Sequence, residues 1–83
     1  MTHMNSEIYE QIKQIMVKNL KVNEIKISEG ATFKDDLSMD SLEQAELIME
    51  LEKTYNCTIS EEDAEKIKTV ADAVNYIETI KNN

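Results

Sequence analysis

The sequence predicts an all-α protein: a small four-helix bundle with three longer helices, one short helix, and a long ordered loop between helices one and two. Three observations favour this fold class. The 83 residues contain no proline and a single glycine, so helix-breaking residues are nearly absent. Apolar residues recur at helical spacing in several segments, and residues typical of N-caps precede them. A β-rich fold would need more turn residues.

The first half of the chain predicts one helix followed by a long loop. The helix covers residues 6–19, and Asn5 or Ser6 can cap its start. Its apolar residues recur at helical spacing: Ile8, Ile12, Ile15 and Met16. Residues 20–40 lose this periodicity, and an ordered loop of such length often belongs to a functional site. We expect the loop to be pinned by its apolar residues, which are Val22, Ile25, Ile27, Phe33 and Leu37.

The second predicted helix, residues 41–55, carries two apolar stripes instead of one when its side chains are projected around a helical axis. The first stripe consists of Leu47, Ile48, Leu51 and Tyr55. The second consists of Leu42, Ala45 and Met49, and it is bordered by Glu46, Glu52 and Lys53. We infer that the first stripe faces the core and that the second stays at the surface.

Two further helices are predicted after a short connection. Ser60, followed by three acidic residues, has the form of an N-cap with a negative first turn, and it starts a short helix that reaches about Lys66. Thr69 and Asp72 repeat this pattern. The last helix then carries Val70, Ala73, Val74, Ile77 and Ile80 on one side and frays at residues 81–83. Because no repeat or linker occurs, we expect residues 1–83 to form one domain.

The charge of the chain narrows the classes of partner. Nine lysines, no arginine and 17 acidic residues give a net charge of −8. This charge repels both nucleic acid and anionic membrane surfaces, so a basic protein surface is the natural complement. Neither a signal peptide nor a run of 18 apolar residues is found, and we therefore expect a cytoplasmic protein that does not span a membrane.

Catalysis and metal binding have little support in the sequence. Cys57 is the only cysteine and His3 the only histidine, so an internal disulfide is impossible and a zinc site would lack ligands. A Cys–His catalytic pair is also disfavoured, because His3 lies in the first few residues. We expect Cys57 to fill space in a loop. Residues 1–4 are either native sequence with little order or a remnant of cloning.

Ser41 stands where the long loop becomes the second predicted helix. A helix N-terminus stabilises a phosphate ester in its first turn, because its N–H groups are unpaired and its dipole is positive there. An ordinary cap is the simpler interpretation. Either Ser41 with Gln44 or Asp40 with Glu43 fits a capping box worth about 1 kcal/mol. Spacing alone favours the cap.

A longer pattern surrounds this serine. The motif Asp40-Ser41-Leu42, preceded by Phe33, Asp36 and Leu37, resembles the Asp-Ser-Leu signature and the Phe-x-x-Asp-Leu element of the acyl carrier protein family. The resemblance to a discrete type II acyl carrier protein covers nearly the whole chain. It continues through Glu46-Leu47, Leu51-Glu52, the run from Ile59 to Ile67, Thr69-Val70 and Tyr76-Ile77.

This resemblance implies a non-catalytic carrier. A separate phosphopantetheinyl transferase would move 4′-phosphopantetheine from coenzyme A to the hydroxyl of Ser41, which Asp40 and Leu42 flank. The terminal thiol of this covalent arm would hold acyl intermediates as thioesters for the enzymes of fatty acid biosynthesis. From charge and family together, we expect a monomer.

The acidic residues around Ser41 predict a docking surface. Its partners would be the transferase, fatty acid synthesis enzymes and acyltransferases that carry basic patches, with the charges speeding encounter and the second apolar stripe supplying short-lived contact. The predicted surface comprises Asp35, Asp36, Glu43, Ala45, Glu46, Met49 and Glu52. A solvated acidic face is the simpler alternative.

The family also shelters the acyl chain between the second helix and the third or fourth. This implies a pocket lined by Leu47, Ile48, Leu51, Ala64, Ile67 and Ala73. Ordinary core packing is the alternative for these six residues.

Ser38 departs from the family pattern, since many relatives have glycine in the turn before the signature. If this turn requires a positive φ, serine is strained there. Ser38 also brings a second hydroxyl close to Ser41, although it lacks the Asp-Ser-Leu context.

Two other functions remain open. The chain could be a dedicated carrier for a polyketide, nonribosomal peptide or modified-lipid pathway. From a different class, it could be an unmodified acidic helical interaction module in which Ser41 is only a helix cap.

Overall fold

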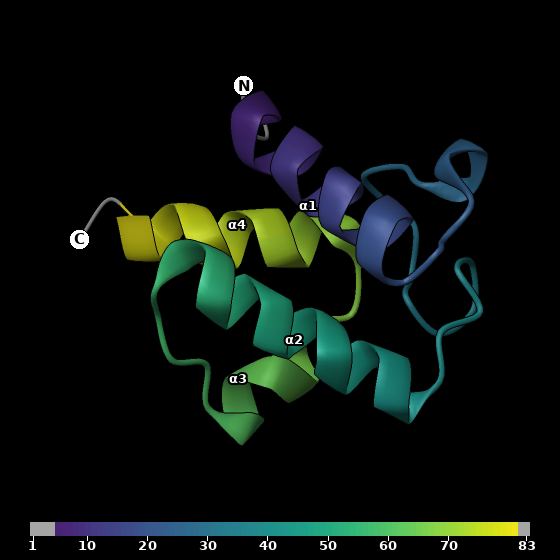
Figure 1. Ribbon diagram of the computed structural model, residues 1–83. Helices are drawn as coiled ribbons and strands as arrows, with labels where there is room; N and C mark the ends of the chain where they lie inside the picture. Colours follow the sequence, from purple (N-terminus) through teal and green to yellow (C-terminus); the bar gives the residue numbers. More distant parts are fainter. Residues whose placement is uncertain (1–4, 82–83) are drawn as a thin grey trace.

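Four α-helices and one short 3₁₀-helix form the computed structural model, which describes residues 5–81 (Figure 1). The elements are α1 Ser6–Asn19, η1 Glu24–Lys26, α2 Ser41–Tyr55, α3 Glu61–Lys66 and α4 Val70–Lys81. Within residues 5–81 there is no β-strand, only an isolated bridge between Thr32 and Thr69. The predicted all-α class, with three longer helices, one short helix and a long loop before α2, is confirmed. The question about residues 1–4 lies outside the described residues.

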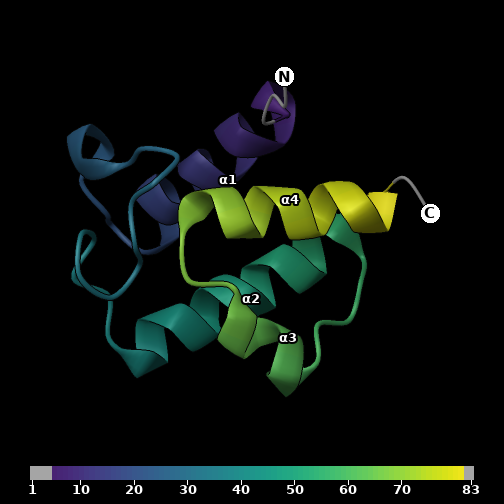
Figure 2. The ribbon, with the colours of Figure 1, turned by 180° about the vertical axis from the view of Figure 1, so that it is seen from behind.

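The core lies where α1 packs against α4 and α2. In two opposite views, α3 lies on the side of the molecule away from α1 (Figures 1 and 2). The buried residues of α1, α2 and α4 follow the helical spacing seen in the sequence: Ile8, Ile12 and Met16, then Leu47 and Leu51, then Val70, Ala73, Val74 and Ile77. Helix α3 has no buried residue.

The helices begin at the caps that the sequence predicts. The Ile8 N–H donates to Asn5 Oδ1 (3.1 Å) at the start of α1, and the Asp63 N–H donates to Ser60 Oγ (3.2 Å) at the start of α3. Before α4, Thr69 and Asp72 exchange two such bonds. Because each cap satisfies N–H groups that the helix leaves unpaired, local sequence is enough to define where these helices start.

The long loop, residues 20–40, is fixed by apolar anchors and by backbone hydrogen bonds. Ile27, Phe33 and Leu37 are buried as predicted, Val22 is half-buried, and Ala31 and Met39 are further buried anchors that the prediction lacked. The Phe33 N–H donates to the Lys68 carbonyl (3.0 Å), and the Val70 N–H donates to the Ala31 carbonyl (3.1 Å). These bonds hold the loop against the start of α4.

Ile25 is not an anchor, and its prediction was wrong. Its side chain is 91% exposed. It lies in the middle of η1, a single turn closed by the Lys26 N–H donating to the Asn23 carbonyl (3.0 Å) and capped by the Ile25 N–H donating to Asn23 Oδ1 (3.0 Å). A turn this tight directs only its flanks inward, so Val22 and Ile27 pack against the core while Ile25 faces water.

No helix of residues 5–81 has the length and apolar character needed to cross a membrane.

Candidate functional site

Ser41 is the first residue of α2, and the cap of this helix is its neighbour. The Glu43 N–H donates to Asp40 Oδ1 (2.8 Å), and the Asp40 N–H donates to Glu43 Oε1 (3.1 Å). Of the two capping boxes that the sequence allows, the structure therefore contains the one between Asp40 and Glu43. Ser41 is exposed, and its hydroxyl makes no hydrogen bond to any of residues 5–81. It is free to react.

The end of the long loop determines where Ser41 stands. Met39 is buried, its N–H donates to the Phe33 carbonyl (2.8 Å), and its carbonyl accepts from Gln44 Nε2 (3.2 Å). Through Met39, the end of the loop is therefore bonded both to Phe33, a buried residue of the same loop, and to Gln44 in the first turn of α2. Because two buried residues bracket the turn at Ser38, the serine after it has a defined position.

Ser38 has a positive φ of 55°. The turn before α2 therefore requires the left-handed conformation, which explains why a glycine suits this position. A residue with a Cβ pays roughly 1–2 kcal/mol to adopt it, and this cost is carried by the buried anchors on either side, Leu37 and Met39. Ser38 is exposed but lies before the helix, without the free helical N–H groups that surround Ser41.

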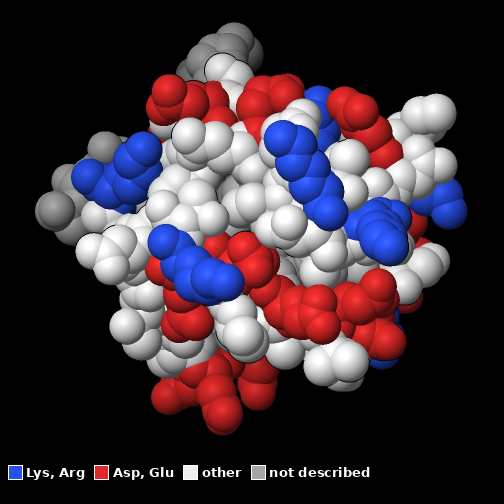
Figure 3. Space-filling model, viewed as in Figure 1, with Lys and Arg blue, Asp and Glu red and all other residues white. Residues whose placement is uncertain are grey.

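The second apolar stripe of α2 is exposed, as the sequence predicts. Leu42 is 68% and Met49 57% exposed, and Ala45 is exposed between them. Figure 3, in which α2 faces the viewer, shows acidic side chains over α2 and α3, with lysines among them, and further acids along the upper edge. Glu46 is exposed on the same side of the helix as the stripe. An apolar strip bordered by Glu46 therefore runs along α2 from the site of Ser41, while Lys53, also predicted at its border, pairs with Glu50 (3.6 Å).

The other acids of the predicted docking surface differ in how freely they face solvent. Asp35 is exposed. Asp36 is exposed but accepts the Thr32 N–H (2.9 Å), and Glu43 is engaged in the capping box. Glu52 is half-buried and accepts the Ile59 N–H (2.7 Å), so it holds the connection between α2 and α3. Three of these carboxylates thus also serve the fold.

The six residues of the predicted acyl pocket divide into two groups. Leu47, Leu51 and Ala73 are fully buried in the core, and Ile48 is half-buried beside it. Ala64 and Ile67 line a hollow of about 590 Å³, here called the Gln44 hollow. The polar lining of this hollow was not predicted, because its residues come from separate segments that only the fold brings together: Thr32, Lys34, Asp35, Gln44, Glu65 and Lys68.

Cys57 lies half-buried in the connection between α2 and α3. Burial and the nearby Glu52 carboxylate raise the pKa of its thiol above the usual value. The neutral thiol is a poor nucleophile, which supports a space-filling role. Among residues 5–81, no group of three or more His, Cys, Asp or Glu side chains is arranged to hold a metal ion.

Comparison with known families identifies the chain. Residues 10–77 match the family described as phosphopantetheine attachment site. This match covers most of α1, the long loop, α2, α3 and most of α4. Proteins of this family are carriers rather than catalysts, and they attach 4′-phosphopantetheine covalently to a serine. The protein therefore belongs to the phosphopantetheine attachment site family, that of the acyl carrier proteins.

Proposed function

We propose that the protein carries acyl intermediates as thioesters on a 4′-phosphopantetheine arm attached to Ser41, and that it delivers them to the enzymes of fatty acid biosynthesis. One observation carries this proposal. The Ser41 hydroxyl is exposed and unbonded at the first residue of α2, because Asp40 takes the capping role. In a family that attaches its arm to a serine, this is the hydroxyl best presented for modification.

Attachment would proceed on a separate phosphopantetheinyl transferase. Ser41 Oγ would lose its proton and form a bond to the phosphorus that bears pantetheine, while the pyrophosphate bond of coenzyme A breaks and adenosine 3′,5′-bisphosphate leaves. A phosphodiester and a terminal thiol would result. The N–H groups of Ser41 and Leu42, at the start of α2, would stabilise the new anion by roughly 0.3–1 kcal/mol.

The neighbouring carboxylates are compatible with this anion. Asp40 and Glu43 each accept a backbone N–H within the capping box. Their charge is therefore partly neutralised by donors of the helix start, and their positions are fixed. The phosphodiester would lie at a helix end that is already built to hold negative charge.

The partners proposed for this protein are enzymes with basic patches that recognise the exposed side of α2: the transferase, enzymes of fatty acid synthesis and acyltransferases. The net charge of −8 and the acids over α2 and α3 would attract such patches over distances set by ionic strength. Leu42 and Met49 would then contribute a small apolar contact. A contact of this size suits a carrier, which must leave each enzyme quickly.

The Gln44 hollow and the core beneath it would shelter the acyl chain. Gln44 lies one turn after Ser41 on α2, so an arm attached at Ser41 starts beside this hollow. Each buried CH₂ would contribute about 0.8 kcal/mol. That gain would favour a modest rearrangement of the core residues below the hollow.

Intact mass measurement after incubation with coenzyme A and a broad-specificity phosphopantetheinyl transferase tests the proposal. We expect the wild type to gain the mass of one phosphopantetheine group and Ser41→Ala to gain nothing. Ser38→Ala is the matched control, since it removes the other nearby hydroxyl, and it should be modified as the wild type is. A wild type that stays folded yet unmodified would favour the acidic interaction module instead.

Further experiments address the finer parts of the proposal. Loading of the modified protein by fatty acid synthesis enzymes, compared with loading by enzymes of polyketide, peptide or modified-lipid pathways, would separate a general carrier from a dedicated one. Light scattering after gel filtration should give the mass of a monomer, because the net charge of −8 makes copies repel one another. We propose the cytoplasm as the place of action.

A further inference from the structure

Helix α3 is the least firmly held helix of the structure. It has six residues, none of them buried, and a helix this short is not stable without tertiary contacts. The buried residues lie just outside it, Ile59 before its cap and Ile67 after its end. The core therefore holds α3 mainly through the buried residues on either side of it, Ile59 and Ile67. Within α3, the half-buried Ala64 packs against the core.

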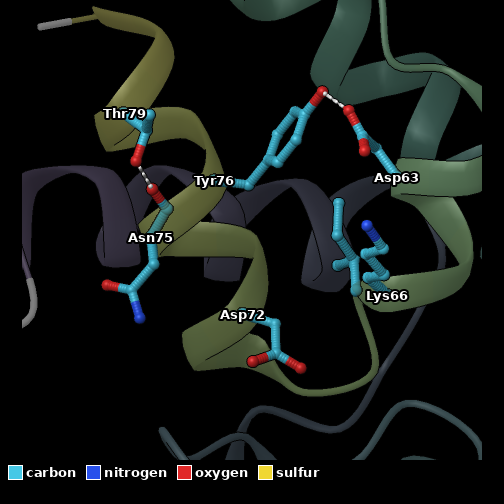
Figure 4. Close-up of a pocket in the computed structure, with 7 residues that line it drawn as sticks. Asp63, Lys66, Asp72, Asn75, Tyr76 and Thr79 are labelled. Carbon is cyan, nitrogen blue, oxygen red and sulfur yellow. Dashed lines mark hydrogen bonds between the residues drawn. The ribbon is translucent and has the colours of Figure 1, made fainter.

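One side-chain hydrogen bond ties α3 to another helix. Tyr76 Oη, on α4, donates to Asp63 Oδ2 in the first turn of α3 (2.8 Å), and the ring spans the space between the two helices (Figure 4). Within residues 5–81, no other side-chain hydrogen bond and no ion pair joins α3 to α1, α2 or α4. The bond to Asp63 raises the pKa of Tyr76 to about 12, so the phenol keeps its donor proton throughout the physiological range.

Two hollows lie beside α3, and one residue is common to both. The Gln44 hollow has about 590 Å³. A smaller one of about 240 Å³, here called the Tyr76 hollow, lies along α3 and α4 and is shown in Figure 4. Ile67 lines both hollows and is the lining residue that they share. Asp63 and Tyr76 line only the smaller hollow, where their bond keeps α3 close to α4.

We infer that the Tyr76–Asp63 hydrogen bond is a latch, which holds α3 against α4 and whose release moves Ile67 and joins the two hollows into one. The inference rests on the proposed function, in which an acyl chain enters from the side of Ser41. Tyr76 then acts as a positioning residue that determines the length of chain the protein shelters. Short chains occupy the Gln44 hollow with the latch closed, and longer chains need it open.

The energy of one hydrogen bond and that of each buried CH₂ are consistent with a latch that opens above a certain chain length. A hydrogen bond to a charged acceptor changes an equilibrium by roughly tenfold or more. Each additional buried CH₂ changes it by roughly fourfold. Two or three methylenes beyond the capacity of the Gln44 hollow are therefore enough to open the latch, whereas a chain that already fits gains nothing from opening it.

Hydrogen exchange of the unmodified protein tests the latch directly. Tyr76→Phe keeps the ring and removes the donor, and we expect amides of residues 61–67 to exchange about tenfold faster, with amides of α1 unchanged. Asp63→Asn keeps an acceptor without the charge and should give a smaller effect. Tyr55→Phe is the matched control, because the Tyr55 hydroxyl bonds to Gln11 on α1 and not to α3. Equal exchange of α3 in Tyr76→Phe and Tyr55→Phe would overturn the inference.

A second readout follows chain length. Wild type, Tyr76→Phe and Tyr55→Phe are each loaded with butanoyl and tetradecanoyl groups, and the rate of thioester cleavage by hydroxylamine is measured. The tetradecanoyl thioester of Tyr76→Phe should be cleaved more slowly than that of the wild type, because an open latch buries the longer chain at less cost. Butanoyl thioesters should be cleaved equally. If both chain lengths change by the same factor, Tyr76 supports the structure without determining length.

The two readouts separate failure of the latch from failure of the carrier proposal. Exchange is measured without the arm, so it does not depend on whether Ser41 is the attachment residue. If the protein is never modified but α3 exchanges faster in Tyr76→Phe, the latch is supported and the carrier proposal fails. If the protein is modified but α3 exchange is unchanged in Tyr76→Phe, the carrier proposal stands and the latch is ruled out.

Discussion

The two sides of α2 have similar residues in opposite environments. Leu51 on one side is fully buried, whereas Leu42 on the other side is mostly exposed. Both are leucines of the same helix, about two and a half turns apart. Position on the helix therefore decides whether an apolar side chain stabilises the fold or stays available at the surface.

The exposed side carries features that the buried side lacks. Leu42, Ala45 and Met49 form a strip that begins next to the free hydroxyl of Ser41, and Glu46 borders it. Single exposed apolar residues are common on protein surfaces, but a strip that continues from a reactive group is a better candidate for contact with partners. The side of α2 that carries Leu51 therefore maintains the structure, whereas the side that carries Leu42 and Met49 is available for interaction.

The largest expected difference between the two sides is in stability. Leu51→Ala removes a fully buried side chain and should lower the free energy of unfolding by about 2–5 kcal/mol. Leu42→Ala removes an exposed one and should change it by less than about 0.5 kcal/mol. Urea unfolding of both variants measures the difference. Similar losses in the two would show that the exposed strip is packed in solution.

A smaller difference is expected between neighbours in the first turn. Asp40→Ala removes the acceptor of the Glu43 N–H and should lower the free energy of unfolding by about 1 kcal/mol. Ser41→Ala should change it by less than about 0.5 kcal/mol, because its hydroxyl is unbonded among residues 5–81. For a domain of this size, 1 kcal/mol moves Tm by roughly 4–8 °C. The opposite ranking would make Ser41 the cap and weaken its role as a free hydroxyl.

The smallest expected effect is on delivery, and it applies to the exposed side alone. Glu46→Lys should reduce the rate of acyl transfer to a fatty acid synthesis enzyme about fivefold at low salt, the factor for roughly 1 kcal/mol of Coulomb energy at a surface. The difference should shrink as salt is added. Glu29→Lys makes the same charge change in the loop near the start of α4. A rate lowered equally by both would indicate total charge and not a docking side.

The helices and their starts could be predicted closely because they depend on local interactions. The cap of α3 at Ser60 and the Thr69–Asp72 pair before α4 each involve residues three apart, and the buried stripes repeat every three or four residues. The long loop was less predictable. Phe33 and Leu37 anchor it, but Ile25 does not, since apolar character alone does not indicate whether a turn faces the core or water.

The candidate site shows the same division. The sequence pointed to Ser41 and allowed two capping boxes around it, because both pairs have the required spacing. Choosing between them needed the extended backbone at Asp40, which follows from the left-handed turn at Ser38 and the burial of Met39. The polar lining of the Gln44 hollow could not be predicted, since its residues come from the loop, α2 and the region of α3.

By itself the sequence determined the helices, the caps of α3 and α4 and the two sides of α2, because each depends on residues a few positions apart. It also determined the family, through motif residues spread along the chain. Only the tertiary structure decided that the Ser41 hydroxyl is free and that Glu52 accepts the Ile59 N–H in the connection between α2 and α3. It also decided that Tyr76 on α4 donates to Asp63 on α3. These facts depend on distances between segments that are separate in the chain. Such distances arise only when the core packs, and no local pattern contains them.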